Sequence, residues 1–302
     1  MTDLNNTGGD PDDMQSLLHL LWYADQLDIV GIVPDAWGGG GVEQTRKLVS
    51  AYEADYFARN WGSLNYPTPA TMLSRIATNS GEAVAMINRE AAASNEPLYV
   101  LIWGGLQTLN LALNQRPDLA SRLRVLTIAS NVKYEGGCAE RNWNSTGRDA
   151  VFNDSRFSNL WWIESDWTYN GMFIGSEPRQ MLNTLSGYGS MGSQMAAVVA
   201  GSPGLQYFRA GDTPTVLYLI DPSNQLTNPA QGSWAGAFTR PFPSQRPNYW
   251  TDVAGDSNWN YQNPCASWPS KERKFVAATA TLQQQRGAMY TALLNKLARI
   301  YR

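Results

Sequence analysis

Residues 10–27 (DPDDMQSLLHLLWYADQL) and 28–33 (DIVGIV) predict a helix that leads directly into a buried strand. Asp10 is the expected N-cap, because its carboxylate can accept hydrogen bonds from the first free backbone N–H groups, and Pro11 suits the first helical position. Two further acids follow in the first turn, where the helix dipole favours negative charge. The β-branched run after this helix is ended by a proline and a glycine loop, which is typical of a strand buried on both faces.

The same alternation of helix and strand continues downstream. Helices are expected at 42–60, 81–94 and 106–114, and strands at 98–103, 123–129 and 160–164. This order predicts an α/β fold with a mostly parallel open sheet and helices on both faces. In such sheets, ligands bind at the carboxyl ends of the strands.

The chain is expected to form one domain over residues 1–302, since no change in composition divides it. Asp212 is predicted to cap a helix over 212–220. Residues 222–269 are rich in Pro, Gly, Ser, Asn and Trp with little periodicity, so we expect an irregular excursion that forms a lid or part of a pocket wall. A helix over 271–302 completes the chain.

Composition narrows the class of partner. The net charge is −3 with one His, so no basic footprint for nucleic acid or for a membrane surface is present. No apolar run reaches the ~18 residues of a membrane helix. Charged residues make up only 16%, while 12 Trp and 14 Tyr accompany many amides. This mixture suits sugars, whose ring faces stack on aromatic side chains and whose hydroxyls bond to amides and carboxylates.

Two features bear on the compartment. Sequons begin at Asn5, Asn144 and Asn153 and indicate a secreted or extracellular protein, although no signal peptide precedes Asp3. Cys138 and Cys265 allow one disulfide, and two free thiols explain them equally well.

Four acids, Asp3, Asp10, Asp12 and Asp13, surround a Gly-Gly pair at the start of the first helix. Carboxylates this close repel one another and need either solvent or a cation. Because the set offers only oxygen ligands, it favours Ca²⁺ over zinc. The alternative is that these acids serve only as a helix cap and first turn.

Residues 2–13 with 28–32 resemble the opening of the nucleoside-hydrolase-like family that includes cellulose-binding bacterial proteins, and more distantly that of the inosine-uridine nucleoside hydrolases. Residues 104–113 are similar to the segment that lends a main-chain carbonyl to calcium in those hydrolases. Residues 211–220 resemble the late segment whose Asp closes the metal site. Residues 232–236 (GSWAG) look like a signature of the cellulose-binding branch.

The resemblance implies a Ca²⁺ site in which Asp13 and Asp212 are side-chain ligands and the Gln107 carbonyl contributes from the backbone. Asp12 would bind substrate hydroxyls. Asp3 and Asp10 compete for the acid that is both ligand and general base, and Asp3 is preferred because Asp10 already has a capping role.

Other candidate binding residues follow from the resemblance and from local sequence. Glu140 and Asn142 resemble a ribose-gripping pair. Trp37 and Trp234 lie in Gly-flanked loops and could stack on sugar faces, whereas the adjacent Trp161-Trp162 pair of the predicted strand must face opposite sides.

The implied activity is calcium-dependent hydrolysis of a glycosidic bond in a saccharide or nucleoside-like substrate. The competitors are a non-catalytic carbohydrate-binding protein and an N-ribosyl nucleoside hydrolase. The latter is weakened because Gly211 stands where those enzymes keep a His, and His19 is expected to be a packing residue. Only Met1 and Thr2 precede Asp3, so either the gene start is truncated or the sheet is completed differently. Relatives of this fold often pair, which suggests a homodimer by analogy.

Overall fold

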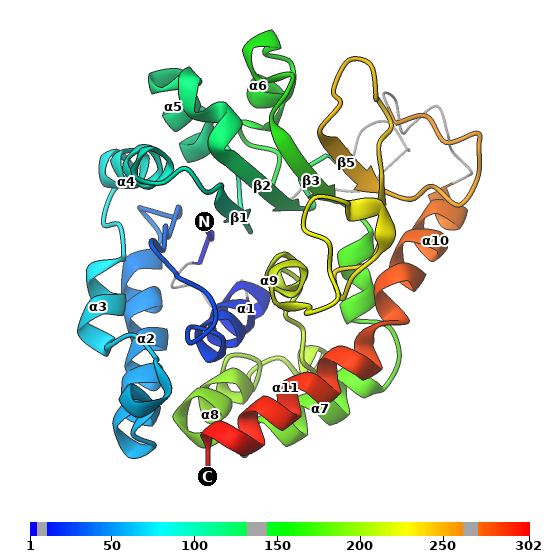
Figure 1. Ribbon diagram of the computed structural model, residues 1–302. Helices are drawn as coiled ribbons and strands as arrows, with labels where there is room; N and C mark the ends of the chain where they lie inside the picture. Colours follow the sequence, from blue (N-terminus) through cyan, green and yellow to red (C-terminus); the bar gives the residue numbers. More distant parts are fainter. Residues whose placement is uncertain (5–10, 132–143, 262–270) are drawn as a thin grey trace.

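The computed structural model describes residues 1–4, 11–131, 144–261 and 271–302. Its centre is a five-stranded sheet in the order β1-β2-β3-β5-β4, and four of these strands are parallel (Figure 1). The fifth strand, β4, pairs antiparallel to β5 at the edge. The strands are β1 (Leu98–Ile102), β2 (Leu123–Ile128), β3 (Trp161–Ser165), β4 (Phe238–Thr239) and β5 (Tyr249–Asp252). The predicted mostly parallel α/β sheet is therefore confirmed.

Helices cover both faces of the sheet (Figure 1). On one face lie α4 (Ser80–Ala93), α5 (Gln107–Gln115) and α6 (Arg148–Phe152), and on the other lie α1 (Pro11–Trp22) and α9 (Thr213–Ile220). Strand residues alternate between these layers, because successive side chains of a strand point to opposite faces. Trp161 packs in the core on the α1 and α9 side and Trp162 in the core beside α5, as predicted for this pair.

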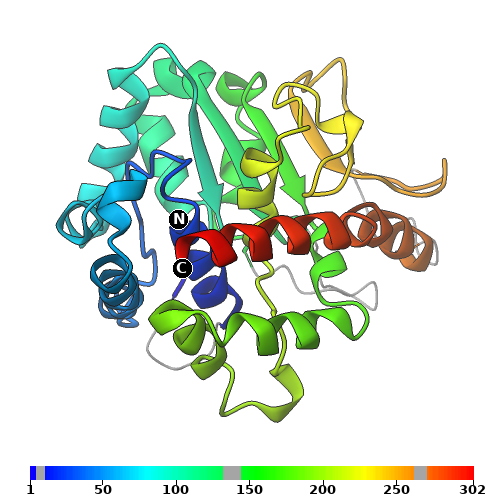
Figure 2. The same ribbon diagram turned by 60° about the horizontal axis from the view of Figure 1, so that its bottom comes forward.

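The remaining helices surround this framework. Both views show α10 (Lys271–Gln283) and α11 (Arg286–Ile300) running end to end along one side of the molecule (Figure 1, Figure 2). The prediction of a single helix over 271–302 is therefore wrong, because the helix is interrupted between Gln283 and Arg286. The remaining helices are α2 (Gly41–Ala58), α3 (Pro69–Ser74), α7 (Glu177–Leu185), α8 (Gly189–Ala197), α10 (Lys271–Gln283) and α11 (Arg286–Ile300). Short 3-10 turns are η1 (Trp61–Leu64), η2 (Pro117–Arg122), η3 (Ser155–Phe157), η4 (Thr168–Met172), η5 (Pro203–Leu205) and η6 (Pro229–Gln231).

The strand predicted over residues 28–33 does not form. Ile32 makes only an isolated bridge to Ile76, and Thr2 makes another to Pro34. The helix before it also ends early, at Trp22 rather than Leu27. Without a full-length neighbour on each side, the β-branched run stays extended but does not build a ladder.

Met1 and Thr2 occupy the position beside β1 where a longer strand could lie. The Trp103 N–H donates to the Met1 carbonyl (2.8 Å), and the Thr2 N–H donates to the Val33 carbonyl (2.9 Å). These two residues thus join the end of β1 to the extended run around Val33. Beyond them an apolar groove of about 560 Å³ separates β1 from residues 28–33.

The segment predicted to be an irregular excursion, 222–269, also contributes to the sheet. It holds β4 and β5, and β5 pairs in parallel with β3. The four residues of β5 are all buried, including Asp252, and pairing with β3 on one side and β4 on the other makes this short polar-containing segment a strand. Within the described part of the chain, no helix combines the length and the apolar character needed to cross a bilayer.

Candidate metal and substrate site

Four predicted acids come together beside the carboxyl end of β1, and we call Asp3, Asp12, Asp13 and Asp212 the acidic centre. Asp3 follows the Met1–Thr2 stub, and its Cβ lies 2.9 Å from where a side chain at Gly104 would begin. Gly104 therefore lets the Asp3 backbone and side chain approach the residues that follow β1. This close approach gives a steric reason for glycine at position 104, which the sequence alone does not reveal.

Asp13 lies at the middle of this centre and is 2% exposed. Its Oδ1 accepts a hydrogen bond from the Thr2 hydroxyl. Burial, followed by the negative charges of Asp212, Asp3 and Asp12, raises the pKa of Asp13 well above its usual range. In the metal-free chain Asp13 therefore favours a proton or an external cation.

Asp212 is the predicted N-cap of α9, but its side chain makes no capping hydrogen bond to that helix. Its carbonyl instead accepts from the Thr215 hydroxyl (2.8 Å), which in turn accepts from the Trp103 indole N–H (2.8 Å). These contacts fix the start of α9 against the end of β1. With Asp212 only 3% exposed, a local capping role does not explain this carboxylate.

Asp12 faces the same place from the first turn of α1. One of its oxygens lies 2.7 Å from where a side chain at Gly211 would begin, and the Phe173 ring lies 2.9 Å from that point. No larger residue, including a His, fits at position 211 without displacing them. Arg209 is the nearby cation, with its Nε 3.6 Å from Asp12 Oδ1.

Two further titratable residues, Tyr169 and His19, lie near the acidic centre. The pKa of Tyr169 is raised mainly by burial and further by the negative charges of Asp12 and Asp212. His19 is buried in α1, and its Nδ1 lies 3.4 Å from the Thr213 hydroxyl. Burial and Lys296 lower the pKa of His19 to about 3, so it is neutral near pH 7 and packs within the core.

Three other predicted site residues, Gln107, Trp37 and Trp234, lie within the described part of the chain. Gln107 begins α5 with an exposed side chain, and helix carbonyls point toward the C-terminal end of the helix. The predicted metal role of its carbonyl stays a prediction. Trp37 packs against the small cluster around Val33, and Trp234 packs against the main core. Asp10, Glu140, Asn142, Cys138 and Cys265 lie outside the described residues.

The donor set of the acidic centre suits a hard divalent cation. Its four members offer carboxylate oxygens, and the charges of Asp212, Asp3 and Asp12 add to burial in raising the pKa of Asp13. Within residues 1–4, 11–131, 144–261 and 271–302, however, no three His, Cys, Asp or Glu side chains converge closely enough to form a complete metal site. The carboxylates are of the ligand type that calcium prefers, and they lie near one another. The described residues do not, however, form a complete set of calcium ligands.

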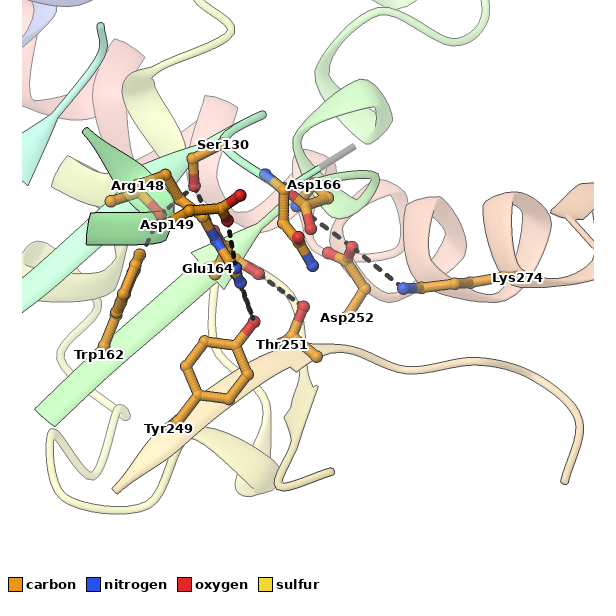
Figure 3. Close-up of polar contacts among 12 residues, drawn as sticks. Ser130, Arg148, Asp149, Trp162, Glu164, Asp166, Tyr249, Thr251, Asp252 and Lys274 are labelled. Atoms are coloured by element: carbon orange, nitrogen blue, oxygen red, sulfur yellow. Dashed lines mark hydrogen bonds and ion pairs between the residues drawn. The ribbon is translucent and has the colours of Figure 1, made fainter. Parts of the chain in front are cut away.

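A second set of buried charges lies at the carboxyl ends of β2, β3 and β5 (Figure 3). Glu164 of β3 is fully buried and accepts from the Arg148 guanidinium (2.7 Å between Nη2 and Oε2) and from the Ser130 hydroxyl (2.5 Å). The Tyr249 hydroxyl donates to the same carboxylate. Burial alone would raise the pKa of Glu164, but Arg148 and these hydrogen bonds hold it below its usual value.

Next to Glu164 lie two more buried acids and one cation (Figure 3). Asp252 accepts backbone N–H groups from the turn after β3, including that of Trp167 (2.9 Å), and its Oδ2 lies 3.9 Å from Lys274 Nζ. Asp166 accepts from the Asn131 N–H (2.9 Å). Burial, then Glu164 and Asp252, raises the pKa of Asp166 well above its usual range.

We call this second set the charge network; it comprises Arg148, Glu164, Asp166, Tyr249, Asp252 and Lys274. Sequence reasoning missed it. One signal was available, because Glu164 is an acid within a run predicted to be a buried strand. Such an acid requires a cationic partner, but the sequence does not reveal that Arg148 supplies it.

Asp35 was missed as well. It follows the extended run around Val33, and its N–H donates to the Thr2 carbonyl (2.7 Å) while its Oδ1 accepts from the Thr108 hydroxyl (2.6 Å). These bonds connect the stub before Asp3 to the start of α5.

Comparison with known proteins identifies the family of this chain. No curated protein matches the chain. Among solved structures, the chain is similar to the inosine-uridine preferring nucleoside hydrolase from Bacillus anthracis, with 14% sequence identity and a TM-score of 0.48; the similarity covers 88% of this chain and 96% of that one. Residues 1–238, which include all four members of the acidic centre, match the family described as cellulose-binding Sde182, nucleoside hydrolase-like domain, and the chain belongs to that family.

Proposed function

We propose that this protein is a calcium-dependent hydrolase that cleaves a glycosidic bond in a saccharide or nucleoside-like substrate. The observation that carries the proposal is the buried Asp13, whose pKa is raised by burial and by the charges of three nearby acids, Asp212, Asp3 and Asp12. Such an excess of buried carboxylate is costly unless protons or a cation balance it. Membership of a nucleoside-hydrolase-like family supports a hydrolytic role for these acids.

In this proposal Asp13 and Asp212 hold calcium through their carboxylate oxygens. Bound calcium would supply positive charge that anchors sugar hydroxyls and favours ionisation of a nearby water. Asp3 takes the proton from the attacking water, with Asp10 as the competing base. Asp12, which is more exposed than Asp13, binds substrate hydroxyls. The neighbouring carboxylates stabilise positive charge that develops on the sugar ring.

The leaving group would not be protonated by histidine. The only His is buried and neutral, and Gly211 has no room for another. This observation weighs against an N-ribosyl nucleoside hydrolase that depends on such a residue.

The experiment is a product-release assay on nucleosides and on β-linked oligosaccharides, with calcium and with chelator. We expect calcium-dependent release by the parent chain. Asp212→Asn should lose both metal binding and turnover, whereas Asp3→Asn should keep substrate affinity and lose turnover. Full activity in Asp212→Asn would overturn the shared site.

The second candidate function is carbohydrate binding without turnover. The family description, which names cellulose binding, favours it. Calcium-dependent retention on cellulose without product release from any substrate would establish this alternative. The carbohydrate ligand is thus common to both candidates.

A secreted location would fit either candidate function, and a homodimer would be tested by light scattering.

A further inference from the structure

A buried glutamine joins the two segments that carry the acidic centre. Gln15 lies in α1, two residues after Asp13, and is fully buried. Its Oε1 accepts the backbone N–H groups of Arg209 (2.5 Å) and Ala210 (3.1 Å). Ala210 lies two residues before Asp212. One side chain therefore connects the start of α1 to the segment that leads into α9, only two residues away from a predicted calcium ligand on each side.

The Nε2 group of Gln15 is bonded as well. It donates to the Met195 carbonyl (3.2 Å) in the last turn of α8 and to the Tyr207 carbonyl (3.2 Å). The last four carbonyls of a helix have no partner within that helix, and Gln15 supplies one of them with a donor. A side-chain amide has two donor hydrogens and two acceptor lone pairs, and Gln15 uses all four. Neither a carboxylate nor a hydrocarbon of the same length offers this set of groups.

The Gln15 amide is uncharged, whereas both segments that it joins carry acids. Asp12 and Asp13 lie in the first turn of α1, and Asp212 lies directly before α9. Like charges on neighbouring segments repel each other, so the segments need a contact that opposes their separation. A lysine or arginine would provide that contact, but its charge would also neutralise the carboxylates that an external cation requires. A neutral amide bonded to the backbone holds the segments together and leaves the carboxylates available.

We propose that Gln15 is a positioning residue that sets the spacing between Asp13 and Asp212 and thereby the affinity of the acidic centre for calcium. Its four hydrogen bonds all go to backbone groups, so it acts through the backbone before Asp212 rather than on the cation itself. The proposal rests on the metal site of the proposed function and adds a residue on which that site depends.

The test compares calcium binding by the parent chain, Gln15→Met and Tyr66→Phe after treatment with chelator. Methionine is flexible and similar in length to glutamine, but it makes none of the four hydrogen bonds. Tyr66→Phe is the matched control, because the buried Tyr66 hydroxyl donates to the Trp22 carbonyl (2.6 Å) at the other end of α1. That end lies roughly 10 Å along the helix from Gln15. Both variants thus lose buried hydrogen bonds to α1, but only one loses them beside the acidic centre.

Calcium affinity is measured by calorimetry at a temperature at which thermal melts show every variant to be folded. If Gln15→Met does not fold, Gln15→Asn replaces it, since that change keeps the amide but shortens its reach by one methylene. The same loss of calcium affinity is expected for either substitution, because neither side chain can hold residues 209–210 at the native distance.

We expect Gln15→Met to bind calcium about tenfold or more weakly than the parent, as is typical when a group that orients metal ligands is removed. Tyr66→Phe should melt at a lower temperature and keep the parent's Kd. A Gln15→Met variant with a lower melting temperature and an unchanged Kd would overturn the proposal, and so would a parent chain that binds no calcium. Failure of the hydrolase proposal is seen separately: a Kd that depends on Gln15, with no turnover of any substrate, removes the hydrolase and keeps the positioning role.

Discussion

The acidic centre and the charge network both contain buried carboxylates near the carboxyl ends of the strands, but they differ in charge balance. In the charge network, Glu164 pairs with Arg148 and Asp252 lies beside Lys274. In the acidic centre, Arg209 lies beside Asp12 at the more exposed side. Asp13, at the middle, is surrounded by three other acids.

This difference in charge balance distinguishes acids that stabilise the fold from acids that bind a ligand. A buried acid paired with the protein's own cation is complete in itself, and its loss affects folding. A buried acid that faces other acids is incomplete, and a proton or an external ion must balance it. We therefore propose that the charge network stabilises the sheet and that the acidic centre binds a ligand.

The largest effect is expected when the charge network loses a cation. Arg148→Met leaves Glu164 buried without its partner, and we expect the free energy of unfolding to fall by ~3–5 kcal/mol, measured by urea titration. Arg156→Met is the control, since Arg156 and Asp154 form an exposed ion pair. A similar small loss in both variants would show that Arg148 does not stabilise the sheet in this way.

Removing an acid should have opposite signs in the two regions. Glu164→Gln leaves Arg148 without its carboxylate and should cost roughly 3 kcal/mol. Asp13→Asn removes an acid that the fold keeps protonated at pH 7 while the unfolded chain ionises it, and this should stabilise the metal-free chain. Both are measured by urea unfolding in chelator. If Asp13→Asn destabilised as much as Glu164→Gln, the acidic centre would not carry excess charge.

Asp166 allows a test within the charge network itself. Arg148 pairs with Glu164 and Lys274 lies beside Asp252, so Asp166 is the third acid of a network with two cations. Its folded-state pKa is raised by burial, Glu164 and Asp252, so the folded chain keeps a proton that the unfolded chain loses above roughly pH 4. This residue therefore makes stability fall as pH rises from about 4 through its folded-state pKa. In Asp166→Asn the amide replaces the protonated acid and that decline should become shallower. An unchanged slope of stability against pH would mean that Asp166 is ionised when folded.

The sequence predicted the framework well, because helix and strand periodicity is local. The strands at 98–103, 123–129 and 160–164 and the helix start at Pro11 are confirmed within a few residues. Residues 28–33 have the composition of a strand, yet Ile32 makes only an isolated bridge to Ile76, because pairing depends on neighbours that local sequence does not reveal. The strand β5 was missed for the converse reason, since only its contact with β3 makes a short polar-containing segment a strand.

The candidate site was predictable in part. Asp12 and Asp13 lie in one helix turn, so their proximity follows from sequence, whereas the approach of Asp212 depends on how α9 packs against β1. The resemblance to a known family supplied that long-range pairing. Periodicity could not have revealed the pairing of Arg148 with Glu164 or of Lys274 with Asp252. Those contacts join distant segments whose spacing in the chain carries no signal.

The most direct test of the difference between the two regions is a calcium titration followed by thermal or urea unfolding. It compares the chelator-treated parent chain, Asp13→Asn and Glu164→Gln. We expect calcium to stabilise the parent by ~2.7 kcal/mol at a hundred times its Kd, and to stabilise Glu164→Gln by a similar increment from a lower baseline. Asp13→Asn should gain little or nothing. A parent chain whose stability does not respond to millimolar calcium, or an Asp13→Asn variant that responds as the parent does, would contradict the assignment of the acidic centre to a metal.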